Sequence, residues 1–221
     1  MNTSQRLSIA SVFVALAAAV SVLAAPALPD PMVTHWNAVG DPDGTLSKAL
    51  GLWLVPVVSL LMVLLFALLP RIDPLGENVA AFRPYYDWFV VVLTAYLFVV
   101  HAGIVAFNLG YRFDFTALVL AGAAGLLYYA GVLLTHADRN WFVGIRTPWT
   151  LSNEDVWERT NALGARLFKL TALVALVGLL AGDYAIYFLL VPVVLSAAVT
   201  VLYSYYLYAR LEGDGTTPGA D

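Results

Sequence analysis

The sequence contains no cysteine and has little charge. The absence of cysteine from all 221 residues excludes disulfides, thiol catalysis and cysteine metal sites. Charged residues make up 12% of the chain, whereas a soluble domain has about 25%. Because 61% of the residues are hydrophobic, we predict an integral membrane protein, with the lipid bilayer as its first partner.

A clustered basic surface and the common catalytic motifs are also missing. The net charge is -4, and nucleic-acid binding needs a basic face that neutralises phosphates. We therefore expect no nucleic-acid partner. No H-E-x-x-H, P-loop or G-x-S-x-G sequence and no serine, histidine and carboxylate triad is visible. We expect a protein that is not an enzyme and holds no cofactor.

Long apolar runs make up most of the chain. A helix needs about 20 residues to cross the hydrocarbon core, and such runs cover residues 7–29, 49–70, 88–111 and 115–135. The run over 167–209 is about twice this length, so it must fold back, and we place the break at Gly182-Asp183. These runs predict an all-α bundle of six transmembrane helices, with an interfacial cytoplasmic helix before the fifth.

The predicted spans form two units. Residues 1–70 would be a two-span unit with an outward-facing loop over 28–48. Residues 71–213 would be a four-span unit with a cytoplasmic loop over 136–166, followed by a flexible tail over 214–221. A signal peptide is a competing interpretation of the first run, because Arg6 precedes it and Ala25-Pro26-Ala27 has the form of a cleavage site.

The positions of lysine and arginine predict the orientation, since cytoplasmic loops are enriched in both. Only Lys48 and Arg112 fall on the side opposite the N-terminus. All other basic residues fall on the N-terminal side: Arg6, Arg71, Arg83, Arg139, Arg146, Arg159, Arg166, Lys169 and Arg210. We therefore expect a multi-pass protein of the cell membrane with both termini in the cytoplasm.

The outer loop is rich in proline, glycine and aspartate, which predicts turns rather than regular structure. Its strongest turn signal is residues 41–44, because Pro42 fixes φ and Gly44 tolerates a positive φ. His35, Asp41 and Asp43 are candidate metal ligands, but their spacing lacks the pattern of a calcium loop. We expect no metal here.

Other polar and aromatic residues of this loop have structural interpretations. The loop acids are expected to pair with Lys48 or to accept hydrogen bonds from backbone amides. Trp36 is expected to lie at the level of the lipid headgroups, as interfacial tryptophans do.

His101 interrupts the run over 88–111. An ionisable group at membrane depth is a functional hypothesis, here a small-molecule transporter or channel with His101 near its path. The alternative is a neutral histidine that shares a hydrogen bond with Tyr96, Asn108 or a neighbouring helix. The structural interpretation is favoured because no acidic residue lies near the middle of a predicted span.

The stretch 140–166 is the longest polar interval. Residues 140–150 are expected to form a loop against the membrane, followed by a helix with Ser152 as its N-cap and Asp155 completing a capping box. The predicted helix has an apolar face beside a basic one, which favours an interfacial position on an anionic leaflet. The basic face contains Arg159, Ala162, Arg166 and Lys169.

Two interpretations of this stretch remain open. In one, a recognition surface is formed by Arg146, Asn153, Trp157, Thr160 and Asn161, residue types that are common in binding hot spots. In the other, these side chains fix the loop to the headgroups and to the ends of the spans.

At these two stretches the chain resembles the SdpI family of bacterial and archaeal membrane proteins, and the resemblance covers nearly its whole length. The N-terminal part is similar to a domain of unknown function that commonly precedes the SdpI region. The matching positions there are His35, Trp36, Asn37, Gly40, Asp43, Gly44 and Lys48, and we add the neighbouring Asp41 to this outer motif. The C-terminal matches are Gly144, Arg146, Thr147, Pro148, Trp149, Asn153, Trp157, Thr160 and Asn161, which we name the inner motif.

The family is named for an immunity protein against a secreted toxin of the sporulation-delay system. The resemblance therefore implies a multi-spanning protein that gives immunity to, or senses, an extracellular toxic peptide. It also implies a cytoplasmic regulatory protein as a second partner.

Overall fold

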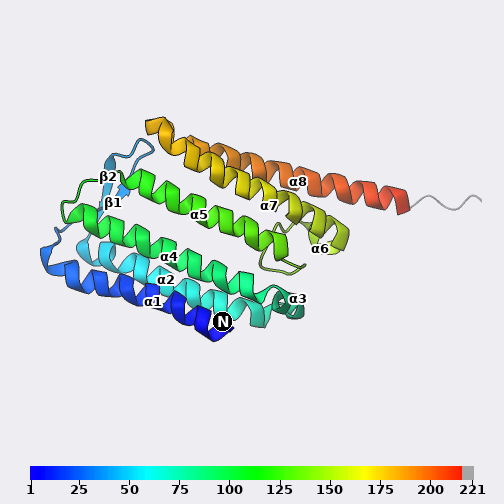
Figure 1. Cartoon of the computed structure of the whole chain (residues 1–221), viewed down its shortest axis with the longest axis horizontal. Coiled ribbons are helices and arrows are strands. Elements are labelled where there is room, and N and C mark those ends of the chain that lie inside the picture. Colours follow the sequence, from blue (N-terminus) through cyan, green and yellow to red (C-terminus); the bar gives the residue numbers. More distant parts are fainter. Residues whose placement is uncertain (216–221) are drawn as a thin grey trace, which may run out of the picture.

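The computed structural model describes residues 1–215, and long helices dominate it (Figure 1). Six of the described helices are long and apolar enough to cross a membrane, which confirms the predicted all-α bundle. They are α1 (Thr3–Ala24), α2 (Lys48–Ile72), α4 (Arg83–Asn108), α5 (Phe115–His136), α7 (Glu154–Gly178) and α8 (Tyr187–Gly215). The shorter elements are η1 (Ala25–Ala27), β1 (Met32–Trp36), β2 (Pro42–Leu46), α3 (Gly76–Ala81), α6 (Pro148–Ser152) and η2 (Leu179–Tyr184).

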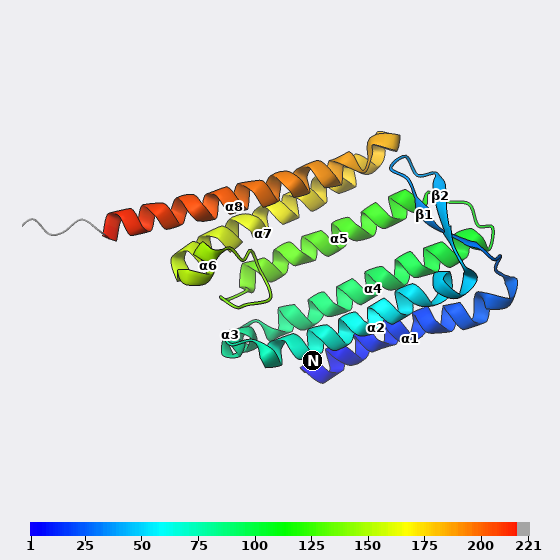
Figure 2. The ribbon, with the colours of Figure 1, turned by 180° about the vertical axis from the view of Figure 1, so that it is seen from behind.

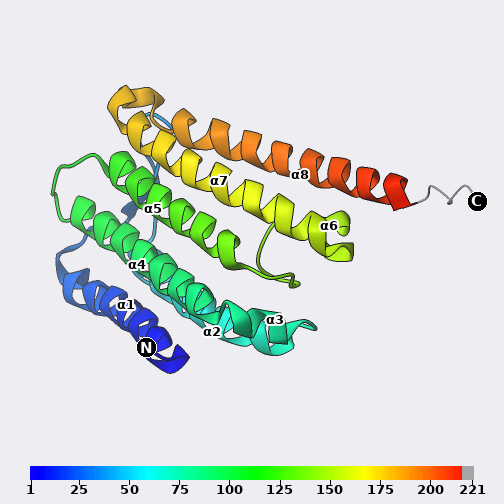
Figure 3. The same ribbon diagram turned by 45° about the vertical axis from the view of Figure 1, so that its right-hand side comes forward.

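Three of the six long helices form a cluster, and the other three extend from it as a row. Helices α1, α2 and α4 pack against one another, and α5, α7 and α8 continue from α4 in that order. Figures 2 and 3 show this succession from behind and from the side. The β1–β2 hairpin lies at one end of the bundle, and α3, α6 and the N-terminus lie toward the other. We call these the hairpin end and the loop end.

Small residues bring the row of helices close together. A Cβ added to Gly131 of α5 would lie 2.8 Å from the Ala165 carbonyl oxygen of α7. One added to Gly122 would lie 2.6 Å from the Tyr96 ring of α4. Both glycines therefore have the packing role expected of small residues in lipid. Gly125 has no such contact within 4 Å.

The fold-back in the last apolar run occurs where the sequence predicts it. Gly182 has φ +58°, a conformation that glycine adopts without a steric cost, and it ends the helical path before α8. Gly178 precedes it and packs against Phe188, so that α7 and α8 form a tight antiparallel pair. The segment over 71–87, between two of the apolar runs, contains α3, and α4 begins before Pro84 because proline is accepted in the first helical turn.

The prediction of turns alone for the outer loop was wrong. Residues 32–46 form an antiparallel hairpin, and residues 42–44 lie in β2 rather than in the turn. The reversal occurs at 37–41, where the Asn37 side chain accepts hydrogen bonds from the Val39 and Asp41 amides. Gly40 supplies the positive φ, at +91°, that we had assigned to Gly44.

The helix of the inner stretch begins one residue later than predicted. The N-cap is Asn153, whose side chain accepts a hydrogen bond from the Val156 amide, and not Ser152, which ends α6. Asp155 therefore lies in the first turn, where its charge favours the helix start. At the other terminus α8 continues through residue 215, and the rest of the predicted tail over 214–221 lies outside the described residues.

Candidate functional sites at the two ends of the bundle

The hairpin is held against the bundle by one amide side chain. Asn108, at the end of α4, donates a hydrogen bond to the Val33 carbonyl and accepts one from the Val33 amide, each at 2.8 Å. The side chain thereby takes the place of a neighbouring strand along β1. Below it, Met32 is fully buried in a cluster that includes Leu28, Leu52 and Ile104.

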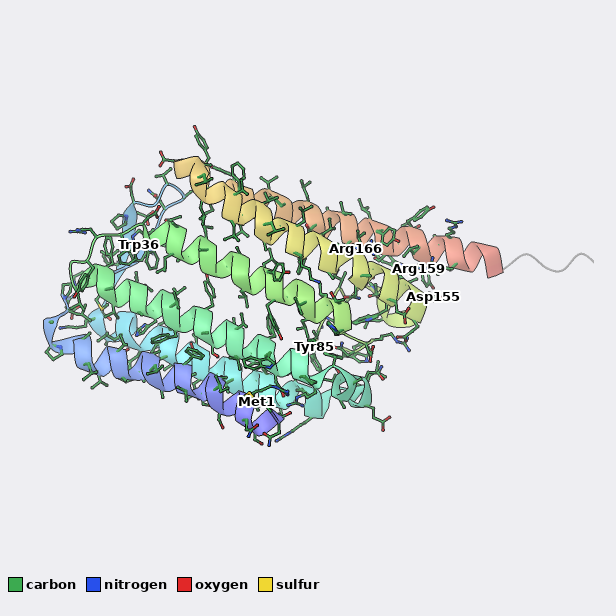
Figure 4. All side chains as sticks on the ribbon, viewed as in Figure 1. Met1, Trp36, Tyr85, Asp155, Arg159 and Arg166 are labelled. Atoms are coloured by element: carbon green, nitrogen blue, oxygen red, sulfur yellow. The ribbon has the colours of Figure 1, made fainter. Side chains whose placement is uncertain are left out.

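Trp36 is half-buried against aromatic rings of the bundle, and its position at the level of the lipid headgroups stays a prediction. Its ring stacks on Phe115 with the ring centres 3.8 Å apart, and it meets Phe107 edge to face at 5.1 Å. Trp36 therefore packs the tip of the hairpin onto the ends of α4 and α5. Figure 4 shows it at the hairpin end, far from Asp155, Arg159 and Arg166 of α7.

The charged residues of the outer motif are one exposed pair, the exposed Asp41, which joins no ion pair among the described residues, and one engaged lysine. His35 and Asp43 are adjacent on the two strands, and their side chains are in contact while remaining 71% and 43% exposed. The Lys48 side chain donates to the Ala25 and Leu28 carbonyls at 3.2 and 2.8 Å, so it does not pair with the loop acids. The other expectation, that loop acids accept from backbone amides, holds for Asp30, which accepts the Lys48 amide at 3.0 Å. Among the described residues, no group of three or more histidine and acidic residues could hold a metal.

Two open cavities flank the hairpin. One, of about 330 Å³, lies between β2 and the beginning of α2 and is lined by Thr45, Leu46, Gly51, Leu54 and Val55, among others. The second, of about 270 Å³, lies between the hairpin, α4 and α5 and includes Trp36, Phe115 and Ile186. Apolar groups dominate both surfaces, so an apolar side chain is the natural occupant of either.

The inner motif forms the core of a folded loop. Trp157 is 1% exposed and donates its indole N–H to the Ala137 carbonyl at 2.9 Å. Asn161 is 2% exposed and accepts the Ile145 amide at 2.9 Å. Gly144, with φ +121°, passes so close that an added Cβ would lie 2.9 Å from both of these side chains. Side chains of the first turns of α7 therefore hold the loop over 137–147 in its conformation.

Further side-chain bonds fix the path of this loop. Asn140, which is fully buried, accepts the Phe142 and Val143 amides and donates to the Asp138 and Val143 carbonyls. Thr147 and Thr150 form a capping box that begins α6. The Thr147 hydroxyl donates to Ser204 of α8 at 3.2 Å, which ties the loop to the last helix.

Polar and charged side chains connect the loop to α7 and to the segment that contains α3. The Arg139 guanidinium pairs with Glu154 at 2.9 Å and donates to the Leu151 carbonyl. The Asp73 carboxylate, between α2 and α3, accepts the Trp141 amide at 3.0 Å. Asn78 of α3 donates to the Arg139 carbonyl at 2.7 Å. The loop is therefore tied to the segment between α2 and α4 as well as to α7.

The members of the inner motif differ in exposure. Trp157, Thr160 and Asn161 are buried, so in this conformation they cannot contact a partner protein. Arg146 and Pro148 are exposed, and the Arg146 guanidinium donates to the Trp141 carbonyl. Trp149 is half-buried against Tyr205, Asn153 is half-buried as a cap, and Thr147 is buried. The motif that the sequence presented as one surface is mostly an internal framework.

His101 is fully buried between helices, and its partner is Ser21 of α1 rather than Tyr96 or Asn108. The Ser21 oxygen lies 2.7 Å from the Leu52 carbonyl, 3.1 Å from the Ala17 carbonyl and 2.8 Å from the His101 Nε2 atom. If the single Ser21 hydrogen goes to a carbonyl, Nε2 is the donor to Ser21. The Nδ1 atom has no hydrogen-bond partner among the described residues.

Sequence reasoning missed a buried charge cluster at the loop end. Asp87 of α4 is 0% exposed and lies 2.7 Å from Arg83 and 3.5 Å from Arg6 of α1. A buried carboxylate needs such partners, since an unpaired charge in this setting is strongly destabilising. The only signal in the sequence was an aspartate at the edge of an apolar run, which we had taken as a span end.

An apolar cavity of about 250 Å³ lies beside the inner loop. Its lining comes from five different parts of the chain: Phe66 of α2, Phe89 of α4, Ala130, Leu133 and Leu134 of α5, Phe168 of α7 and loop residues 142–145. The cavity shows that α2 and α4 are less tightly packed against α5 and α7 at this position.

Comparisons with known proteins match both ends of the molecule. The SdpI/YfhL protein family matches residues 136–204, which contain the inner loop and α7. The chain is similar to this family over that region. A domain of unknown function, DUF1648, matches residues 12–60, which contain the hairpin. The SdpI region ends at Ser204, the residue of α8 that Thr147 contacts.

The likeness to a curated member of the family extends over nearly the whole chain. The immunity protein SdpI of Bacillus subtilis (strain 168) is 25% identical over 206 residues, which cover 93% of this chain and 97% of that protein. No solved structure matches the chain significantly. The match supports a multi-pass protein of the cell membrane.

Proposed function

We propose that this protein gives its cell immunity to an extracellular toxic peptide. The observation that carries the proposal is the similarity to an immunity protein along the whole chain, hairpin and inner loop included. A protein that shared only the apolar spans would support no more than a membrane location.

In this proposal the hairpin end faces outward and meets the peptide. The excess of arginine and lysine at the loop end supports this orientation, because cytoplasmic segments are enriched in both. The hairpin offers exposed polar groups in His35 and Asp43 beside two apolar cavities. Such a surface suits a peptide that carries both apolar and polar side chains.

The loop end is the proposed site of a cytoplasmic regulatory partner. The candidates for direct contact are Arg146 and Pro148, which are exposed in the inner motif, and the exposed Arg159 and Arg166 on α7. The buried members, such as Trp157, would act by holding Arg146 in place. Figure 4 shows Arg159 and Arg166 along one side of α7.

A survival assay tests the proposed immunity. Cells that express the chain and cells that lack it are exposed to a panel of secreted antimicrobial peptides and to medium from toxin-producing cells. We expect survival to rise for at least one peptide only where the chain is present. Equal survival across the panel, with the protein present in the membrane, contradicts the proposal.

The alternative of a transporter or channel finds little support in the geometry. His101 is fully buried against Ser21 and lines neither the two cavities beside the hairpin nor the cavity beside the inner loop. Flux into proteoliposomes that falls on His101→Ala would revive the transport hypothesis, whereas wild-type flux equal to that of empty vesicles ends it.

A further inference from the structure

The two hydrogen bonds between the Asn108 side chain and the Val33 backbone determine which edge of the hairpin is free. Both backbone groups of Val33 point toward Asn108, away from β2. Val33 is paired with Thr45 in the register of the hairpin. In an antiparallel pair, two facing residues either bond to each other or both point outward. The amide and carbonyl of Thr45 must therefore point to the opposite edge, away from β1.

This free edge lies beside an apolar cavity. Thr45 and Leu46 of β2 line the cavity of about 330 Å³ together with Leu54 and Val55 of α2. Three of the five residues of β2 are exposed, Thr45 among them. An exposed strand edge binds an extended peptide through main-chain hydrogen bonds, while adjacent pockets take alternate side chains.

The hairpin end is acidic. Its loops contain Asp30, Asp41, Asp43, Asp114 and Asp183 but only two basic residues, Lys48 and Arg112. Both cations are occupied, because Lys48 binds backbone carbonyls and Arg112 lies over the Phe107 ring. None of the ion pairs formed among the described residues includes Asp41, Asp114 or Asp183.

Two of these acids also line a cleft next to the hairpin. Asp114 and Asp183 approach a cleft of about 90 Å³ that Val39 of the hairpin turn closes on one side. An arginine or lysine side chain of a bound peptide would complement these carboxylates, and a peptide with acidic side chains would be repelled.

We propose that β2 binds an extended, basic peptide as a third strand of the sheet, with hydrogen bonds to the amide and carbonyl of Thr45. Apolar side chains of the peptide enter the cavity beside α2, and its basic side chains face the acids of the hairpin end. The proposal rests on the proposed function and specifies the chemistry and conformation of the peptide.

Binding to the full-length protein in lipid nanodiscs tests this proposal, with empty nanodiscs to subtract partition into lipid. The probes are three capped eight-residue peptides: alternating lysine and valine, the same peptide N-methylated at alternate amides, and alternating glutamate and valine. We expect only the first to bind well. Equal binding of the N-methylated peptide, or no binding of the first, overturns the proposal.

Two variants of one position supply the matched control. Thr45→Pro removes the free N–H and places a ring on the edge, which edge strands tolerate, whereas Thr45→Val leaves the backbone groups intact. We expect Thr45→Pro to weaken binding at least about tenfold, the loss of one to two hydrogen bonds. Thr45→Val should bind as the wild type does, and an equal loss in both variants overturns strand addition.

The two proposals can fail separately. Protection from a toxic peptide that persists in Thr45→Pro cells would overturn strand addition and leave immunity intact. Binding of the lysine–valine peptide to a protein that protects cells from nothing would support the edge site and contradict the proposed function.

Discussion

The two polar ends of this bundle are built in opposite ways. At the loop end, the motif residues point inward: Trp157 and Asn161 are buried and bond to the backbone of the loop that crosses them. At the hairpin end, the core residue Met32 is buried, but His35, Asp43 and Thr45 remain at the surface. The polar motif residues of the loop end fix the conformation of a loop, whereas those of the hairpin end are exposed at the surface.

This difference separates residues that maintain the fold from residues that can contact a partner. A buried side chain that satisfies loop amides acts on a partner only through the shape it maintains, whereas an exposed pair or a free strand edge can bind directly. Substitutions at the loop end should therefore reduce stability first. Substitutions at the hairpin end should change binding with little effect on the bundle.

The largest expected effect is from Trp157→Ala, which removes a buried indole and its bond to Ala137. We expect a loss of about 4 kcal/mol in the free energy of unfolding, as for other buried tryptophans, measured by unfolding in mixed micelles. Trp141→Ala is the control, since its side chain is 48% exposed. Similar losses in both variants would contradict the assignment of Trp157 to the framework.

Removal of the buried carboxylate should have the next largest effect. Asp87→Ala leaves Arg6 and Arg83 without their shared partner, and we expect a loss of about 3 kcal/mol. Asp138→Ala removes an exposed carboxylate at the same end and should change stability by under about 0.5 kcal/mol. Equal melting temperatures for the two variants would show that the Asp87 cluster does not hold α1 to α4.

A smaller, local effect is expected from Asn108→Leu. The Val33 amide and carbonyl lose their partners, which costs about 2 kcal/mol and should speed hydrogen exchange over 32–46. Asn78→Leu, which removes a bond at the loop end, should leave that exchange unchanged. Unchanged exchange in Asn108→Leu would mean that the hairpin is held by the stacking of Trp36 alone.

The smallest effect on stability should come from Arg146→Ala. The guanidinium is exposed and has one bond to a carbonyl, so we expect a change of under about 0.5 kcal/mol in unfolding. A loss comparable to that of Trp157→Ala would place Arg146 in the framework and remove the leading candidate for a cytoplasmic contact.

The spans were predictable from sequence because their signal is local: the length of an apolar run and the break at Gly182. The predicted N-cap, Ser152, is one residue before the actual N-cap, Asn153, because serine and asparagine cap helices equally well. The hairpin was missed because Asp41-Pro42-Asp43-Gly44 has strong local turn propensity, while Asn108, which lies 75 residues beyond its partner Val33, stabilises the strand pairing. A tertiary contact therefore overrode the local turn propensity of these residues.

The site was predicted less completely, for a related reason. The motif positions were identified, but a pattern of residues does not show whether Trp157 points toward a partner or into its own loop. Exposure depends on the path of residues 137–147, which is set by contacts with α3, α7 and α8. Asn140 and Asp87 were not identified from the sequence, because neither belongs to a periodic or repeated pattern.

The most direct test of the division between framework and contact surface is the survival of cells carrying the Thr45→Pro and Thr45→Val variants at equal membrane abundance, under a toxic peptide from which the wild type protects. We predict that Thr45→Pro cells lose protection and Thr45→Val cells keep it, with the same melting temperature for both proteins. Full protection by Thr45→Pro would contradict the account, because the free edge of the hairpin would then have no part in immunity.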